Sequence, residues 1–528
     1  MKNILLFKTL VFVTIFSYGQ RQLPFARQQW SETFEKPEQA EFIKTFVLSN
    51  DEFITIRKDD ELLVFQRYTS DMKLLDTKKI DYRHIKEGKL YYKGFLWLGD
   101  NIYIISTHRN EDADEYDIYA QGVTTHGFDL LSPARLSSAE FMKGGVHEDF
   151  GLSHDRSKMF LVHYVKGKEP KEKFVHVKVY SKNLELLWER TFDHSEFETM
   201  MDEGEKSMSM SFGNMSVDDN GDLYFLSRVR LEKNKERKDK PMYYYKLVMV
   251  TNDGDKIKEY DIDMGDKFIT NIYAETNADN IYIAGFYSDR YSSGAAGSFL
   301  IRGTIRTQKF EDPALSEFEH SFVTHYWAKK RTKKADKKLE KKGEKAEFDP
   351  YYVDDIVIGD DGNIFVISEI YYVIARTYYT KTGSYTVYYY YYSNILVNAY
   401  DKKMELLWNS QIPKWQVSKN EGGFFASYHQ TYVNGKLYFV FNDNCQNAVL
   451  EKTNPKKRKA YGFNGYGSNT CVFIAELDED GKVTKEPLYT IDDIGMYTRI
   501  KVTKTFPDGD FIMFARKKKE YKFVRISF

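Results

Sequence analysis

Polar side chains recur at the starts of the strands that would lie innermost in the fold, where they could act on a ligand. They include His147 and Asp149, the pair Asp354 and Asp355, and the run Tyr428-His429-Gln430. Two carboxylates that face one cavity can divide the acid and base work of glycoside hydrolysis. Internal hydrogen bonding and the solvation of a channel are the alternative roles. The candidate ligand-binding residues are His147, Asp149, Tyr352, Asp354, Tyr428, His429 and Arg499.

A tyrosine-rich stretch at residues 368–396 is the second candidate site. It is predicted to form a hairpin of two long strands around the turn Lys381-Thr382-Gly383-Ser384 and to project beyond its own sheet. Tyrosine offers a flat apolar ring and a hydroxyl at small entropic cost, which suits contacts with proteins or stacking on sugars. The alternative is a hairpin that only extends the local sheet. The candidate partner-binding residues are Tyr378, Tyr379, Tyr388 and Tyr390 of this stretch and Lys456, Lys457 and Arg458 of a basic loop.

Known catalytic and metal-binding motifs do not accompany these residues. The sequence has no glycine-rich phosphate loop, no His-Glu-x-x-His and no Gly-x-Ser-x-Gly. Aspartate-rich turns such as residues 218–222 resemble parts of calcium loops, but they lack the glutamate of the twelfth position. We therefore assign no catalytic residue, no metal and no cofactor.

Cys445 and Cys471 are the only cysteines, and both flank strands of one repeat. In an oxidising compartment they could form a disulfide that closes the long insertion between them. Two buried thiols are the alternative, and two cysteines are too few for a zinc site.

The elements that must position these residues form a repeat. Eight times, a tight turn is followed at once by a short apolar strand. These strands start at Phe53, Ile102, Met159, Leu223, Ile281, Ile364, Leu437 and Phe511. Further strands follow each start, for example residues 149–153, 159–165, 174–180 and 184–192, so each repeat is predicted to be a four-stranded antiparallel meander.

Such meanders in series resemble the blades of a β-propeller, and the resemblance covers residues 20–528 as one domain. It implies an all-β fold, but the sequence matches no functional family of propellers that we recognise. The last repeat, residues 498–528, has room for only three strands. We therefore expect residues 28–34 to supply its outer strand and to close the ring, which gives eight blades, with seven as the alternative.

The topology of a meander also sorts the connections between two rims. The turns between the first and second strands of the repeats all lie on one rim. All eight of these turns are short, so we call this rim the short-turn rim. The other rim, the long-loop rim, receives nearly every long or charged segment, including residues 442–469 and the tyrosine hairpin. Because loops on a rigid scaffold carry function, we expect recognition on the long-loop rim and an inert short-turn rim.

One segment departs from the strand pattern, at about residues 312–346. Asp312 can cap a helix with Pro313 at its first position, and Leu315, Phe318 and Phe322 then share one face. An amphipathic helix is predicted here, followed by a lysine-rich run that is either a solvated helix or disordered.

The first 19 residues combine Lys2 and Lys8, an apolar run and a small-residue exit at Gly19, which is typical of a secretory signal. A buried N-terminal strand is the alternative. Because no other stretch is apolar enough to span a membrane, we expect an exported protein without a transmembrane helix. It could be periplasmic, extracellular or associated with the outer membrane, and peripheral association with a membrane fits as well.

The charge of the chain is balanced, with 77 basic and 78 acidic side chains, which argues against a general nucleic-acid binder. These observations favour a non-enzymatic binding or scaffold module for a protein or glycan partner in a bacterial envelope. The alternatives are a carbohydrate-active enzyme with carboxylates in its central channel and a structural subunit of an envelope assembly. The sequence predicts no oligomeric state.

Overall fold

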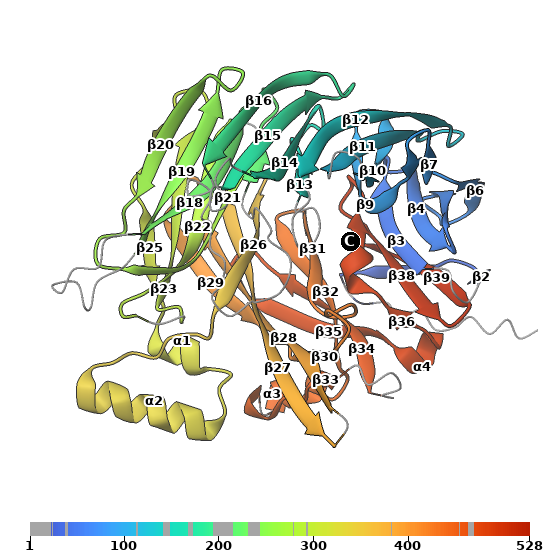
Figure 1. Ribbon diagram of the computed structural model, residues 1–528. Helices are drawn as coiled ribbons and strands as arrows, with labels where there is room; N and C mark the ends of the chain where they lie inside the picture. The colour runs from blue at the N-terminus through green and yellow to red at the C-terminus, as the bar shows by residue number, and fades with distance from the viewer. Residues whose placement is uncertain are drawn as a thin grey trace, which may run out of the picture.

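A series of antiparallel sheets is arranged around a central axis in the computed structural model (Figure 1). The structure describes residues 23, 25–36, 41–111, 115–140, 148–166, 173–193, 215–230, 243–277, 279–291, 294–381, 383–453, 455–462 and 469–528. Within these residues, eight sheets have four strands or more, and we number them 1 to 8 in chain order. The predicted propeller architecture of repeated meanders is confirmed.

Sheets 1 to 4 each contain four strands that pair in sequence order. Sheet 1 has β3 (Glu41–Val47), β4 (Glu52–Asp59), β5 (Leu62–Thr69) and β6 (Leu74–Ile80). After the small hairpin of β7 (His84–Ile85) and β8 (Gly88–Lys89), sheet 2 has β9 (Tyr91–Leu98), β10 (Asn101–Asn110), β11 (Glu115–Thr124) and β12 (Leu130–Glu140). Sheet 3 has β13 (Glu148–Leu152), β14 (Lys158–Lys166), β15 (Lys173–Ser181) and β16 (Leu186–Asp193). Sheet 4 has β17 (Met215–Val217), β18 (Leu223–Arg230), β19 (Tyr243–Thr251) and β20 (Lys256–Ile262).

Sheets 5 to 8 follow the same plan, with additional short strands in sheets 5, 6 and 8. Sheet 5 has β21 (Phe268–Asn277), β22 (Asn280–Ser288), β23 (Gly297–Thr304), β24 (Lys309–Phe310) and β25 (Ala314–Glu317). Sheet 6 has β26 (Tyr351–Ile358), β27 (Ile364–Thr380), β28 (Gly383–Tyr400), β29 (Leu406–Ile412), β30 (Gln416–Lys419) and β33 (Tyr461–Gly462). Sheet 7 has β31 (Tyr428–Val433), β32 (Lys436–Asn444), β34 (Thr470–Leu477) and β35 (Val483–Thr490). Sheet 8 has β36 (Tyr497–Thr498), β37 (Lys504–Thr505), β38 (Phe511–Lys517) and β39 (Glu520–Ser527), together with β1 (Arg27–Trp30) and β2 (Phe34–Glu35).

Apolar side chains hold neighbouring sheets together in eight clusters, one between each pair of successive sheets. Because alternate residues of a strand point to opposite faces, each sheet can supply side chains to the cluster on either side. The cluster between sheets 8 and 1 contains Phe53 and Tyr68 of sheet 1 and Phe514 and Phe523 of sheet 8, all of them buried. The first and last sheets are therefore packed on one another like any other pair.

The N-terminal strands belong to the last sheet. β1 pairs with β39 from Arg27↔Ser527 to Trp30↔Val524, and β2 pairs with the same strand further along. This is the pairing predicted for residues 28–34. The predicted signal at residues 1–19 lies outside the described residues.

The prediction of a helix that begins at Asp312 is wrong. Residues 314–317 form β25, which pairs with the outer edge of β23 from Gly297↔Glu317 to Leu300↔Ala314. β24 covers only two residues of that edge, so main-chain groups remain for β25 to bond, and this tertiary pairing outweighs the local helical spacing.

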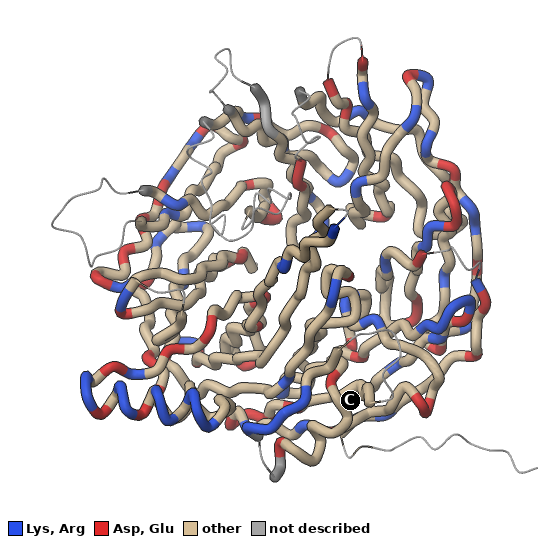
Figure 2. The backbone as a smooth tube through the Cα atoms, turned by 60° about the horizontal axis from the view of Figure 1, so that its bottom comes forward, with Lys and Arg blue, Asp and Glu red and all other residues tan. Residues whose placement is uncertain are grey.

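Helices follow β25. α1 (His320–Thr324) is short, and α2 (Lys329–Lys342) carries the basic run at the side of the molecule, with none of its residues buried (Figure 2). It ends at Gly343, whose φ of 68° is the left-handed conformation that favours glycine. The other helices are α3 (Asn447–Thr453), η3 (Pro455–Lys457), α4 (Ile491–Ile494) and η4 (Ile500–Val502). Among the described residues, no helix combines the length and apolar character that a membrane span requires.

Candidate functional site

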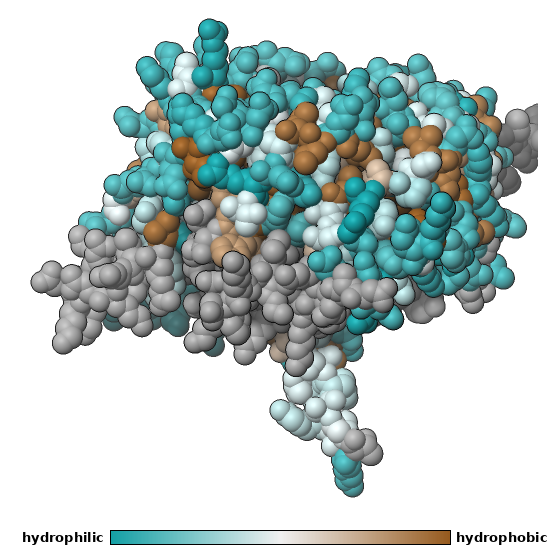
Figure 3. Space-filling model, turned by 45° about the horizontal axis from the view of Figure 1, so that its top comes forward, coloured by the Kyte–Doolittle hydropathy of each residue, from teal (hydrophilic) through white to brown (hydrophobic). Residues whose placement is uncertain are grey.

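The tyrosine hairpin is formed by β27 and β28, which pair without interruption from Tyr371↔Tyr392 to Thr380↔Gly383. β26 accompanies β27 only as far as Ile370, and β30 accompanies β28 only from Tyr389 onward. In the described part of the chain, residues 372–379 and 383–387 therefore have one free strand edge each. The hairpin forms a slender projection from the body of the protein (Figure 3). The predicted extended hairpin is confirmed. It projects from the long-loop rim, which is the rim where the innermost strand of each sheet begins.

Tyrosine rings cover both faces of this hairpin. On one face, Tyr372 stacks on Tyr391 with ring centroids 4.7 Å apart, and Tyr378 stacks on Tyr385 at 5.4 Å. The guanidinium of Arg376 lies 5.2 Å from the ring centroid of Tyr389 on the same face. On the other face, Tyr379 is 85% exposed. Because residues 371–392 include no Asp or Glu, the projection is aromatic and weakly basic.

The insertion between β32 and β34 supports the base of the hairpin. β30 pairs with β28 at residues 389–392, and β33 from the insertion pairs with β30. A disulfide joins Cys445 to Cys471, as the first alternative predicted, and the cysteines are not two buried thiols. Arg458 of the insertion donates to the side-chain oxygen of Asn394 on β28 at 2.6 Å. The insertion is thereby held against the strand that carries the tyrosines.

We expect the loss of this disulfide to lower the free energy of unfolding by about 3 kcal/mol, because it closes a loop of 26 residues. Urea denaturation of the wild type with and without a thiol reductant measures the difference. A Cys445→Ala/Cys471→Ala variant is the control, since its stability should not respond to the reductant. Equal responses of the two proteins would contradict the prediction.

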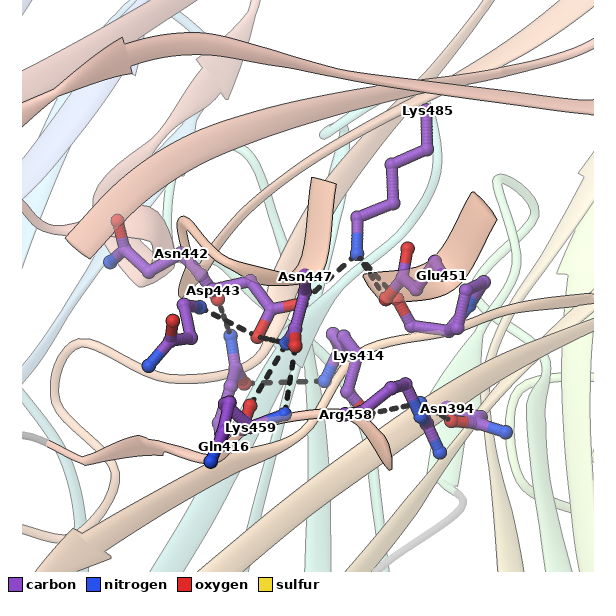
Figure 4. Close-up of polar contacts among 12 residues, drawn as sticks. Asn394, Lys414, Gln416, Asn442, Asp443, Asn447, Glu451, Arg458, Lys459 and Lys485 are labelled. Carbon is purple, nitrogen blue, oxygen red and sulfur yellow. Dashed lines mark hydrogen bonds and ion pairs between the residues drawn. The ribbon is translucent and has the colours of Figure 1, made fainter. Parts of the chain in front are cut away.

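Buried polar groups fix the insertion from inside (Figure 4). Lys485 on β35 donates to Asp443 at 3.0 Å and to Glu451 on α3 at 2.9 Å. Asn447 donates to Asp443 at 2.9 Å and accepts the backbone N–H of Lys459 at 2.8 Å. Two carboxylates thus share one ammonium group. Burial, reinforced by Asp443 and only partly offset by Lys485, raises the pKa of Glu451 to about 7.

This pKa predicts that Glu451 makes the protein less stable as the pH rises. Below the ordinary glutamate pKa of about 4.5, both the folded and the unfolded states are protonated; between about 4.5 and 7 only the unfolded state ionises. Stability is therefore lost across this window, by about 3 kcal/mol. A Glu451→Gln variant should lack this loss, so its stability relative to the wild type should rise from pH 4.5 to pH 8 in thermal melts. A constant difference across this range would contradict the assignment.

A buried ion pair lies where the hairpin leaves the body. Lys414 is 0% exposed, and its ammonium group pairs with the carboxylate of Glu369 on β27. The same ammonium donates to Gln416 Oε1 at 3.2 Å, and Ser427 donates to Glu369 at 2.8 Å. Burial lowers the pKa of Lys414, although the neighbouring carboxylates oppose this. These contacts of Lys414 and Glu369 connect the start of the hairpin to the chain segment that leads into sheet 7.

The structure brings some of the predicted ligand-binding residues together. The hydroxyl of Tyr428 donates to Asp354 at 2.7 Å, across the boundary between sheets 6 and 7. Most of the surroundings of Asp354 are protein, although its side chain is exposed to water. Burial and the nearby Glu369 raise the pKa of Asp354 to about 7. Tyr352 packs edge-on to Tyr371 at the base of the hairpin, with centroids 6.4 Å apart.

Other predicted ligand-binding residues lie apart from this pair. His429 shares a hydrogen bond of 2.9 Å with Thr505, and burial lowers the pKa of its ring to about 3. Asp149 lies on β13 of sheet 3 and accepts the N–H of Phe150 at 2.8 Å. Arg499 donates to the carbonyl of Phe42 at 2.6 Å and is buried, so it joins sheet 8 to sheet 1. His147 lies outside the described residues.

Some of the predicted partner-binding residues are exposed, and others are engaged in contacts within the protein. Tyr378, Tyr379 and Tyr388 are exposed on the hairpin, whereas Tyr390 is half-buried. Lys456 and Lys457 are exposed. The guanidinium of Arg458 is taken up by Asn394, by the carbonyl of Lys414 and by the ring of Tyr326, so that residue supports the hairpin from within.

Comparison with known proteins extends this description only slightly. No family model and no curated protein sequence matches the chain. Among solved structures, it is similar to prolyl oligopeptidase B from Galerina marginata, with 10% identity and a TM-score of 0.37 over 90% of this chain and 55% of that chain. It is also similar to the β-propeller domain of the Trilobed protease from Pyrococcus furiosus (9% identity, TM-score 0.34, 87% and 98% of the two chains). A third match is an uncharacterized protein from Listeria monocytogenes EGD-e (10% identity, TM-score 0.33, 86% and 97%).

The chain spans about half the length of the oligopeptidase that it matches. The assignment of the fold rests on the sheets and their order, and not on these likenesses.

Proposed function

We propose that this protein is an exported, non-enzymatic eight-bladed propeller that binds a protein or glycan partner in a bacterial envelope through its tyrosine hairpin. The single observation that carries the proposal is the projecting hairpin, with exposed aromatic rings and two free strand edges. The eight sheets and the packing of sheet 8 on sheet 1 support a closed ring of eight blades rather than seven.

A free strand edge beside exposed aromatic rings is a hazard for an uncovered protein, because it can pair with other chains. Here the base of the hairpin is fixed by the buried Lys414–Glu369 pair and by the disulfide-closed insertion. Such support suits a projection that must hold a defined position until a partner covers it. The free edges favour a protein that adds a strand, and the lack of acidic residues between 371 and 392 favours an acidic contact surface on that protein.

The test compares tagged full-length protein with a Tyr378→Ser/Tyr379→Ser/Tyr385→Ser variant in cross-linking from native envelope fractions. A Tyr91→Ser/Tyr291→Ser variant is the matched control, because those tyrosines are 55% and 79% exposed elsewhere. We expect a partner that the wild type and the control capture and that the hairpin variant loses. Capture of the same partners by all three proteins would remove the hairpin from the proposed function, and a glycan array with the same variants distinguishes a glycan from a protein.

One observation keeps the carbohydrate-active enzyme as a second candidate. Asp354 is open to water, has a pKa raised to about 7 and contacts Tyr428, which are properties suited to a general acid. An enzyme of this kind should turn over a member of a polysaccharide panel and lose at least a hundredfold in rate on Asp354→Asn replacement. Absence of turnover by the wild type would leave binding as the function.

A further inference from the structure

A pocket of about 520 Å³ opens on the short-turn rim, opposite the hairpin. Four neighbouring sheets form its walls, through β37, β3, β9 and the turn that follows β13. The volume is in the range of small-molecule sites. This rim is predicted from the sequence to be inert because its turns are short, but side chains at the ends of the innermost strands and in the short turns beside them line a pocket.

Three cationic side chains line this pocket: Lys44 on β3, Lys504 on β37 and Arg156 in the turn after β13. Within the described part of the chain, none of the three forms a salt bridge. Burial, together with repulsion from Lys44 and Arg156, lowers the pKa of Lys504. Burial also lowers the pKa of Lys44 and that of Arg156. Like charges around one cavity repel each other, and a bound anion would relieve that repulsion.

The backbone of Arg156 adopts a conformation that is occupied by glycine in the corresponding turns of other sheets. Its N–H bonds to the carbonyl three residues earlier, and its φ is 59°. In other sheets, glycines occupy the same place in the same kind of turn: Gly221, Gly362 and Gly509, with φ of 93°, 84° and 92°. A side chain is disfavoured in this conformation, although Met72 and Leu184 adopt it too, each with φ of 63°.

Trp97 completes the site. The guanidinium of Arg156 lies 3.8 Å from the centroid of its ring, and its indole Nε1 is buried with no hydrogen-bond partner among the described residues. Phe46, Phe95 and Phe506 supply apolar wall next to the charged groups.

We propose that this pocket binds a small organic ligand that carries a multivalent oxyanion, either a phosphate or a group of carboxylates. Lys44, Arg156 and Lys504 bind the anionic group, and the aromatic walls contact the organic part. Arginine and lysine side chains are the usual partners of both phosphate and carboxylate groups. This site is independent of the partner proposed for the hairpin, since the two lie on opposite rims.

The test measures the thermal unfolding of the full-length protein in inorganic phosphate, in citrate and in sodium chloride at equal ionic strength. We expect phosphate or citrate to raise the Tm by several degrees relative to chloride, because an anion that binds only the folded state stabilises it. Phosphate alone would assign a phosphate ligand, citrate alone a carboxylate ligand, and both together a site that selects by charge.

Two variants separate binding from a structural role. Lys504→Gln and Arg156→Gly should lose the anion-dependent shift, and Arg156→Gly should melt no lower than the wild type in chloride, since glycine fits the left-handed turn. Lys73→Gln, at an exposed turn in sheet 1, makes the same charge change and should keep the shift. A wild type that responds to phosphate and citrate no more than to chloride would overturn the proposal. So would retention of the shift in both pocket variants.

Discussion

Replacement of Lys414 by methionine should lower the free energy of unfolding by about 3–5 kcal/mol. The side chain of Lys414 is 0% exposed and that of Glu369 is 4% exposed, so the change leaves a buried carboxylate without its counter-charge. Removal of one member of a buried pair costs far more than the pair contributes, because the remaining charge stays out of water. Urea denaturation, followed by far-ultraviolet circular dichroism, measures the change.

Two further variants give this experiment its controls. Lys436→Met breaks a salt bridge to Glu476 in which the lysine is 40% exposed, and it should cost less than about 1 kcal/mol. A Lys414→Met/Glu369→Gln double variant removes the orphaned charge but keeps a polar group for Ser427, so it should recover part of the loss. Equal effects of Lys414→Met and Lys436→Met would show that the buried pair is not what fixes the base of the hairpin.

Phe523→Ala is expected to destabilise the protein by about 3–5 kcal/mol, the cost of removing a large buried ring. Phe523 lies in the cluster between sheets 8 and 1, with its centroid 5.2 Å from that of Phe53 and 4.9 Å from that of Tyr68. If the ring of eight blades is closed, the boundary between sheets 8 and 1 should contribute as much to the free energy of unfolding as a boundary between two sheets in the middle of the chain.

Phe473→Ala supplies the comparison, because Phe473 is equally buried between sheets 6 and 7. Thermal melts of the two variants should show similar losses and a single transition. A much smaller effect at Phe523, or a separate early transition of the terminal sheets, would indicate a ring that opens between its first and last blades.

The sequence predicts the sheets well because their information is local. A turn followed by a short apolar strand determines the hairpin of each repeat, and the tyrosine hairpin is visible from composition alone. The helix expected from Asp312 fails because the competing interaction, the free edge of β23, is not local. Spacing along the chain cannot show that an edge elsewhere needs a partner strand.

The residues of the candidate sites also differ in whether local sequence reveals them. The exposed tyrosines could be chosen from the sequence, but Lys414, Glu369 and Lys485 could not, since they are far apart in the chain and meet only after the sheets have packed. Lys44 and Lys504 of the pocket lie near opposite ends of the chain. Arg156 alone leaves a trace in the sequence, because it stands where other repeats have glycine in their tight turns.

The pairing of β1 with β39 also determines when this protein can finish folding. Arg27 is made 500 residues before its partner Ser527, which is the difference between 527 and 27. Until residues 520–527 have been made, β39 does not exist and β1 lacks this partner strand, so the nascent chain carries an unsatisfied strand edge throughout that interval. Contacts of such long sequence separation form slowly. Chains that stop short of residue 520 should therefore be targets for chaperones and proteases rather than smaller versions of the same ring.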